Sequence, residues 1–529
     1  MLDSMKYDVG LSMSARQLGT LRDHYKYKLR RDPHLDELYL LDRILELRQS
    51  TSTPITTLTT DSDTLSQTYA DVMAKRKTLP STDAPPTVEE ISGIASAYLE
   101  RIGKSAYPHK AMLFSYGALA PHQLSIGGCH NVISTPHASV GTLPQRRAVS
   151  AGDWLVILNP SPEASCDRYQ VFNEYVKISV TIGKGGMIEA VRHFSGGAYI
   201  DTATLPIPQP CELTALCDAC HGAVLAVIPH EKISAFISGT KQAGMVSFVI
   251  GSLASNGKLT INHARIGTVS FIMQFIRELA PQCNCAAHVR ERYDISKGTQ
   301  RTESYIKVAS DGSRVLATNK AILPDSPFRA SLFAATQAIA GCVAQGADYN
   351  QVCLSAGIQA PNGDYTNQNL ESLLGIYRAQ MEFCIPDIDS TTAGLSAGRG
   401  FSVTVCATAP LPPKTAPKIS SQGALYLLRP RIEKNGLPCF EELRRMWRYV
   451  NQLHKDGKII AACAALDTVD DTLKQLIGED SEFIPENSFK NAGSLRESAA
   501  ILLISTDHIH GELLGKVSAP LFDEVVEQF

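Results

Sequence analysis

The sequence predicts a protein of mixed α/β class, built from several domains. The first observation is that segments with helical periodicity alternate with short apolar runs over much of the chain. The second is a weak internal repeat, because residues 423–428 share the pattern of residues 152–157, and residues 499–503 share that of residues 222–226. The third is length, since 529 residues are enough for two to four domains with ample core.

The composition excludes several classes of partner and location. There are 50 Lys and Arg against 53 Asp and Glu, for a net charge of −3, and no basic stripe, so we expect no nucleic-acid partner. No apolar run approaches the ~18 residues that a membrane helix needs, and the N-terminus lacks a signal-peptide core, so we expect no membrane partner. The 13 cysteines, an odd number scattered along the chain, predict reduced thiols in the cytoplasm.

The N-terminal part contains two predicted helical regions with a linker between them. Residues 7–49 are expected to be mostly helical, with an apolar stripe formed by Leu35, Leu38, Leu41 and Leu45. Residues 51–86 are rich in Ser, Thr, Asp and Pro, which indicates a linker and solvated surface. Residues 87–103 place apolar side chains at helical spacing and predict one more helix.

A candidate phosphate site lies in the next region. Strands are expected at 152–158 and 245–253, and a helix at 228–243. The turn formed by Gly183, Lys184, Gly185 and Gly186 precedes a predicted helix. Such a turn can bind the phosphate of a nucleotide through backbone N–H groups, and Lys184 would add a positive charge. The alternative is a tight turn that only the folding of the chain requires.

The clearest helical patterns lie between residues 325 and 409. Ser326-Pro327 provides a helix start, and apolar residues then recur at helical spacing through Val343, before Gly346 supplies a stop. A strand is expected at 351–355, a helix over 370–381 and a strand at 401–408. Small residues are frequent in the helices, which predicts close packing against a sheet.

The sequence of this stretch resembles that of a known family. The blocks Phe328-Arg329-Ala330, Gly346-Ala347-Asp348-Tyr349, 373–383 (LLGIYRAQMEF) and Ile385-Pro386 are similar in order and spacing to the second synthetase half of phosphoribosylformylglycinamidine synthase. We mean the long single-chain bacterial form of this purine-biosynthesis enzyme, from the aminoimidazole-ribonucleotide synthetase superfamily. The resemblance implies an α+β or mixed α/β fold with duplicated synthetase-type halves.

The same resemblance implies a domain organisation. Each half would carry an N-type and a C-type domain, preceded by a small helical domain. The expected divisions are a helical N-terminal domain (1–50), a linker (51–86), a truncated first N-type domain (87–150), a first C-type domain (151–285), a second N-type domain (286–410) and a reduced second C-type domain (411–529).

Every catalytic motif of the family that can be located is altered in this chain. The family's histidine- and cysteine-containing motif falls at residues 46–51, where Arg48 cannot act as a general acid or base at neutral pH. Residues 104–145 are all that remains of the first nucleotide-binding region, and an aspartate of the family aligns with Thr181. The histidines in that span, His122, His130 and His137, are interpreted as surface or hydrogen-bonded residues, with remnant ligands as the alternative. A C-terminal glutaminase is not expected.

The family's second nucleotide site has a shortened counterpart at residues 387–394. The family has a glycine-rich turn with a lysine and an aspartate after the Ile-Pro pair, whereas this chain has no lysine there. Asp387 and Asp389 are candidate ligands of a metal cation, and the alternative is that they cap and solvate a turn.

Two short clusters of cysteine and histidine leave a redox or zinc role open. They are Cys217, Cys220 and His221, and Cys283, Cys285 and His288. A structural zinc site needs four ligands, so the two half-sites would have to meet.

These observations predict a phosphoribosylformylglycinamidine synthase-like protein that is catalytically inactive and acts as a scaffold or binding protein. No catalytic residue is assigned. The alternative is an ATP-dependent ligase that amidates formylglycinamide ribonucleotide, with ammonia or a partner glutaminase as nitrogen source. The sequence specifies no cofactor by itself, and the resemblance makes magnesium-ATP or ADP the candidate. With one half cut short, we expect a homodimer or a protein partner to cover exposed sheet surface.

Overall fold

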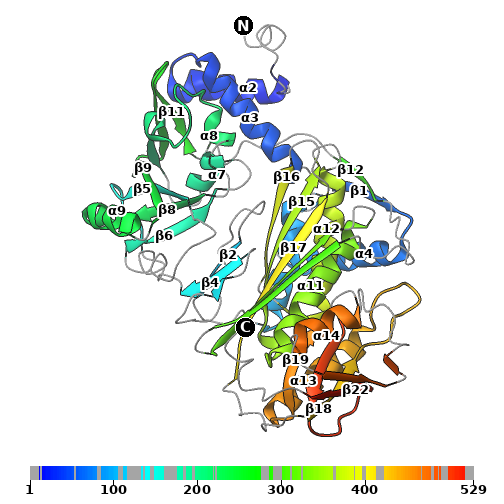
Figure 1. The fold of residues 1–529 in the computed structure, drawn as a ribbon. Helices are drawn as coiled ribbons and strands as arrows, with labels where there is room; N and C mark the ends of the chain where they lie inside the picture. The colour runs from blue at the N-terminus through cyan, green and yellow to red at the C-terminus, as the bar shows by residue number, and fades with distance from the viewer. Residues whose placement is uncertain are drawn as a thin grey trace.

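The computed structural model contains three large sheets, each with its own helices (Figure 1). It describes residues 11, 13, 15–52, 55–79, 85–104, 111–115, 133–134, 138–142, 148–159, 175–182, 186–192, 197–218, 220, 223–242, 244–273, 275, 285–289, 301–309, 312–322, 326–361, 365–385, 388–395, 401–412, 422–465, 468–477, 482–486, 488–489 and 499–518. None of the helices in these residues has the length and hydropathy of a membrane-spanning segment.

The first large sheet has seven strands in the order β11-β10-β7-β9-β5-β8-β6. Its strands are β5 (Trp154–Asn159), β6 (Ile178–Thr181), β7 (Ala198–Asp201), β8 (Val224–Ile228), β9 (Val246–Leu253), β10 (Lys258–His263) and β11 (Gly267–Ile272). Its helices are α7 (Gly186–Arg192), α8 (Ala215–Asp218) and α9 (Ile233–Gln242), with single 3-10 turns η2 (Thr202–Thr204) and η3 (His230–Lys232). The strands predicted at 152–158 and 245–253 and the helix at 228–243 are confirmed.

The N-terminal helices pack on this sheet. They are α2 (Ala15–Asp23), the π-helical turn η1 (His24–Leu29) and α3 (Leu35–Ser52). Leucines of α3 share one apolar core with β5, β8 and β10. The carboxylate of Glu37 is fully buried and lies 2.5 Å from the guanidinium of Arg31, while Asp36 pairs with Arg265 beside β10 at 2.6 Å. The helical N-terminal segment is therefore joined to the sheet by a common core and by charge pairs.

The central sheet has five strands in the order β13-β14-β17-β15-β16. They are β13 (Arg301–Val308), β14 (Arg314–Ile322), β15 (Cys353–Pro361), β16 (Ile388–Leu395) and β17 (Ser402–Pro410). Two long helices, α11 (Pro327–Ala344) and α12 (Tyr365–Phe383), cover one face, and the 3-10 turn η4 (Tyr349–Gln351) leads into β15. The predicted helices and the strand at 401–408 are confirmed.

Small residues let α11 and α12 approach each other closely. Every residue of α11 except Gln337 is buried. A Cβ on Gly375 of α12 would lie 2.2 Å from the carbonyl oxygen of Phe328, a distance that real Cβ atoms do not adopt. The close packing expected from the sequence is therefore present, and it needs glycine at this position.

The interpretation of residues 51–86 as a linker is wrong. This segment contains β1 (Ile55–Thr60), which pairs in parallel with β12 (Cys285–Val289), and helix α4 (Asp63–Arg76). Its many hydroxyl residues include the helix cap Ser62, while Leu65 and Val72 of α4 are fully buried. The apolar stripe of α4 is narrow, so a polar average composition concealed it.

Helices α4 and α5 form a second layer outside α12. The predicted helix at 87–103 is confirmed as α5 (Val88–Arg101), and it packs on both α4 and α12. Arg76 of α4 donates to Glu90 of α5 at 2.5 Å, and Tyr377 of α12 donates to Asp71 of α4 at 2.7 Å. Segments far apart in sequence thus form one helical layer on the central sheet.

The C-terminal unit is a five-stranded sheet in the order β19-β21-β18-β22-β20. Its elements are β18 (Gln422–Leu428), α13 (Phe440–Lys455), β19 (Ile459–Ala464), α14 (Val469–Ile477), β20 (Glu482–Pro485), β21 (Ile501–Ser505) and β22 (Glu512–Ser518). Trp447 of α13 is fully buried, with its ring 4.7 Å from that of Phe383 in α12. Asn451 also donates to the carbonyl of Gly346, so α13 is firmly attached to the central unit.

A small antiparallel sheet, β2-β4-β3, lies beside the central one. Its strands are β2 (Ala111–Ser115), β3 (Ile133–Ser134) and β4 (Ala138–Thr142). Strands β3 and β4 contact β14, and β3 also contacts β13. In Figure 1, β2 and β4 lie on the side of the central sheet away from α4 and α12.

Candidate functional site

The two faces of the central sheet differ in chemistry. The face against α11 and α12 is apolar, with alternate residues such as Val315, Leu354 and Val405 in the core. On the opposite face, the strand registers place Thr318 of β14, Cys406 of β17 and Ser355 of β15 directly side by side. We call these three residues the hydroxyl row. Each is only 1% exposed.

Two members of the hydroxyl row lack hydrogen-bond partners. In the part of the chain that the structure describes, neither Thr318 Oγ1 nor Ser355 Oγ has a partner, although both atoms are buried. The adjacent hydroxyl of Thr408 differs, because it donates to the carbonyl of Val315 at 2.8 Å. A buried polar atom without a partner costs ~1–3 kcal/mol, so these two hydroxyls are candidates for contact with a bound molecule.

The thiol in the row is not a nucleophile. Burial raises the pKa of Cys406 to about 12, so it stays protonated at neutral pH. Burial has the same effect on Cys342 of α11, whose pKa is also raised to about 12. The row therefore presents two hydroxyls and one neutral thiol, and these groups can accept or donate hydrogen bonds but carry no charge.

The candidate metal ligand Asp389 lies on the strand next to β15. Strand β16 runs parallel to β15, and its register places Asp389 opposite Ser355. The expected turn at 387–394 is therefore wrong for residues 388–394, which are strand. Ile388, Thr391 and Thr392 are β-branched, which favours a strand over a turn. Asp387 lies outside the described residues.

The glycine turn is placed only in part. Gly183, Lys184 and Gly185 lie outside the described residues, whereas Gly186 is the first residue of α7, with φ of +60°. A Cβ there would lie 2.3 Å from the carbonyl oxygen of Cys217, at the end of α8. Gly186 is thus required for the close approach of α7 and α8. It lies in the unit of the seven-stranded sheet, whereas Asp389 lies in the central sheet.

The cysteine clusters do not form a metal centre in the described part of the chain. Cys217 is buried in the core of the first unit, and burial raises the pKa of the half-buried Cys220. Cys285 and His288 lie on β12, paired with β1. Among the described residues, no group of three His, Cys, Asp or Glu side chains could hold a metal ion. His221, Cys283 and the three histidines between residues 104 and 145 lie outside them.

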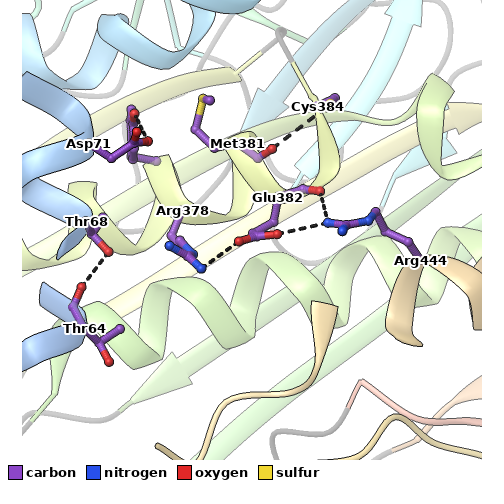
Figure 2. Close-up of polar contacts among 9 residues, drawn as sticks. Thr64, Thr68, Asp71, Arg378, Met381, Glu382, Cys384 and Arg444 are labelled. Carbon is purple, nitrogen blue, oxygen red and sulfur yellow. Dashed lines mark hydrogen bonds and ion pairs between the residues drawn. The ribbon is translucent and has the colours of Figure 1, made fainter. Parts of the chain in front are cut away.

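Sequence reasoning missed a charge network at the end of α12. Figure 2 shows Glu382 between Arg378 and Arg444. Its carboxylate lies 2.7 Å from Arg378 and 2.9 Å from Arg444, which also donates to the Glu382 carbonyl at 2.7 Å. The Arg378–Glu382 pair has the i,i+4 spacing of a helical ion pair and was visible in the sequence. Arg444 comes from α13, and no local signal indicates it.

The chain was compared with known proteins at three levels. No family model matches it. A search among curated proteins also found no match.

The solved structures give a match over nearly the whole chain. PurL from Thermotoga maritima complexed with FGAR aligns with a TM-score of 0.54 and 11% sequence identity, covering 96% of this chain and 100% of that one. The same protein complexed with ATP gives 0.52 and 12%, with the same coverage. Phosphoribosylformylglycinamidine synthase II from Thermotoga maritima gives 0.53 and 12%, again over 96% and 100%. The resemblance predicted from the sequence is confirmed at the level of the fold: this chain has the fold of phosphoribosylformylglycinamidine synthase II.

Proposed function

We propose that the chain is a phosphoribosylformylglycinamidine synthase-like protein that acts as a scaffold or binding protein and does not catalyse amidation. The observation that carries this proposal is the neutral character of the hydroxyl row. An enzyme that catalyses ATP-dependent amidation must transfer protons and stabilise the charge on phosphate. Both tasks need side chains that titrate near neutral pH or carry charge. Thr318, Ser355 and Cys406 provide neither at pH 7, since the pKa of Cys406 is about 12.

The position of Gly186 supports the same proposal. A glycine that is needed for helix packing is explained without a bound phosphate. The network at Glu382 supports it as well, because these charged groups pair with one another and attach α13 to α12. The glycine in one place and the charged residues in the other thus serve the architecture.

The alternative is an ATP-dependent ligase, and one observation favours it. The backbone register of β16 places Asp389 opposite Ser355, a residue whose buried hydroxyl has no partner among the described residues. A carboxylate and hydroxyls are oxygen ligands of the kind that magnesium prefers. In this alternative, magnesium-ATP or ADP would bind along the polar face of the central sheet.

A binding and activity experiment decides between the two. The purified chain is titrated with magnesium-ATP and with ADP by calorimetry and thermal shift, and then assayed for formylglycinamidine ribonucleotide with substrate and ammonia, with Thermotoga maritima PurL as positive control. We expect no product. A nucleotide at a hundredfold excess over its Kd would add about 2.7 kcal/mol of apparent stability, which is easily measured.

The variant Asp389→Asn tests whether nucleotide binding depends on this carboxylate. If wild type binds nucleotide and this variant does not, the ligase alternative gains its metal ligand. If wild type forms product from ammonia, the scaffold proposal is overturned.

A further inference from the structure

A strongly basic, aromatic turn lies on the N-terminal helices. The ten residues from Arg22 to Arg31 contain five Lys and Arg and one acidic residue, in a chain whose net charge is −3. The segment folds as the π-helical turn η1, and Arg30 follows in the left-handed region with φ of +54°. π-helical turns are rare and are found frequently at functional sites.

The inner side of this turn is anchored to the first unit. His24 is buried and stacks on Phe275, with ring centroids 3.9 Å apart. Tyr25 is 2% exposed, and the guanidinium of Arg31 lies 5.2 Å from its ring centroid while pairing with the buried Glu37. The turn is therefore a fixed feature of the fold.

The outer side presents an aromatic ring among cations. Lys26, Tyr27, Lys28 and Arg30 are exposed, and Tyr27 is 64% exposed. The Lys26 ammonium lies 5.3 Å from the Tyr27 ring centroid. Within the described part of the chain, Lys26, Lys28 and Arg30 make no ion pair. Burial lowers the pKa of His24, and the charges of Lys28 and Arg31 lower it further, as expected where positive charge gathers.

We propose that Lys26, Tyr27, Lys28 and Arg30 form a binding surface for single-stranded nucleic acid. The three cations contact successive phosphates, and a base stacks on the exposed ring of Tyr27. This is the combination of cationic surface and stacking platform by which proteins hold single strands without sequence preference. The balanced charge of the whole chain predicted no such partner, because an average over 529 residues hides one concentrated turn.

Other polyanions fit this surface less well. An acidic peptide would pair with the cations but has no planar group that requires the Tyr27 ring. A lipid surface would favour several exposed aliphatic side chains on the turn, whereas Leu29 is half-buried. A free mononucleotide shares the chemistry but contacts one or two cations at most. The surface is separate from the central sheet, so this proposal does not depend on the proposed function.

The test is fluorescence anisotropy of a labelled 20-nucleotide oligo(dT) and oligo(U) with the full chain. Three variants are compared with wild type: Tyr27→Ala, the triple Lys26→Gln, Lys28→Gln, Arg30→Gln, and a control triple at exposed lysines elsewhere, Lys232→Gln, Lys241→Gln, Lys434→Gln. Inorganic polyphosphate and UMP serve as competitors. Because Tyr27 is largely exposed, thermal melting of its variant is expected to match wild type.

We expect saturable binding that weakens with salt, with a slope of log K against log salt of about −2 for three phosphate contacts. The triple variant at Lys26, Lys28 and Arg30 abolishes binding, and the control triple variant does not. Tyr27→Ala weakens binding about fivefold to 150-fold. UMP competes poorly. The proposal is overturned by absence of saturable binding at 50 mM salt, or by equal loss in both triples. It is also overturned if Tyr27→Ala binds like wild type, because the surface would then be a general anion site without base contact.

Discussion

Substitution of Gly186 by alanine tests whether this glycine serves packing or ligand binding. The residue adopts φ of +60°, and its Cβ would lie 2.3 Å from the backbone carbonyl oxygen of Cys217. The left-handed backbone costs an alanine ~1–2 kcal/mol. The contact with backbone, which cannot rotate away, adds an overpacking cost of ~1–3 kcal/mol. We expect Gly186→Ala to destabilise the seven-stranded unit by about 2–5 kcal/mol.

One matched substitution separates these costs, and a second is a control for helix propensity. Gly103 has φ of +80° with nothing within 4 Å, so Gly103→Ala reports the backbone cost alone. Gly93 lies exposed in α5 with nothing within 4 Å, so Gly93→Ala should stabilise by ~1 kcal/mol. Urea denaturation measures stability, and hydrogen exchange of peptides from α7 and β8 shows where it is lost.

If Gly186→Ala costs no more stability than Gly103→Ala, the contact between Gly186 and Cys217 does not require glycine. A second outcome would favour the phosphate site. If Gly186→Ala leaves stability unchanged but removes a nucleotide-induced thermal shift, the glycine serves a ligand.

Three further predictions concern the central unit. Ser355→Ala should be neutral or stabilise by up to ~1–3 kcal/mol, because it removes an unpartnered buried hydroxyl, and a lower melting temperature would instead indicate a bound molecule there. Glu382→Gln should weaken the attachment of α13 by ~1–2 kcal/mol, seen as faster hydrogen exchange in α13, while Arg445→Ala, at an exposed pair, should have little effect. Burial and then Asp71 raise the pKa of Tyr377 above its ordinary value of 10. The contribution of Tyr377 to the free energy of unfolding is therefore complete below pH 10 and is lost as the pH rises further. In urea denaturation at increasing pH, Tyr377→Phe should lose less stability above pH 10 than wild type does.

The helices of the central unit could be predicted because their signals are local. Pro327 at the start and Gly346 after the end bracket α11, and the apolar residues at helical spacing, from Phe328 to Val343, lie within Pro327–Ala344. Strands β13 and β14 were missed because residues 286–318 match the family only loosely. In β14 the apolar alternation at Val315 and Ala317 is interrupted by Asn319, which is buried on the same face. An alternation that is interrupted in this way resembles a polar loop.

The hydroxyl row could not have been predicted from the sequence. Its members, at positions 318, 355 and 406, meet only because the strand order is β14-β17-β15, and no pattern within any one strand specifies that order. Asp389 is a second residue whose position the sequence did not predict. Because the family has a glycine-rich turn at this point, Asp389 was expected in a turn. Its β-branched neighbours instead favour a strand, and Asp389 lies in β16. The resemblance predicted the fold correctly and misassigned the local structure at the point where this chain departs from the family pattern.

Agreement in fold at 11–12% identity leaves the chemistry undecided, and the reason is visible in α12. Most of this helix is specified by packing: Leu370, Leu374 and Gly375 are buried and can vary only within tight limits of volume. Catalysis depends on a few polar positions whose replacement leaves that packing intact. A chain can therefore keep this fold while the polar positions on the opposite face of its central sheet change. Ligand binding at Ser355 and Asp389, measured with and without Asp389→Asn, is accordingly more informative about this chain than any further comparison of folds.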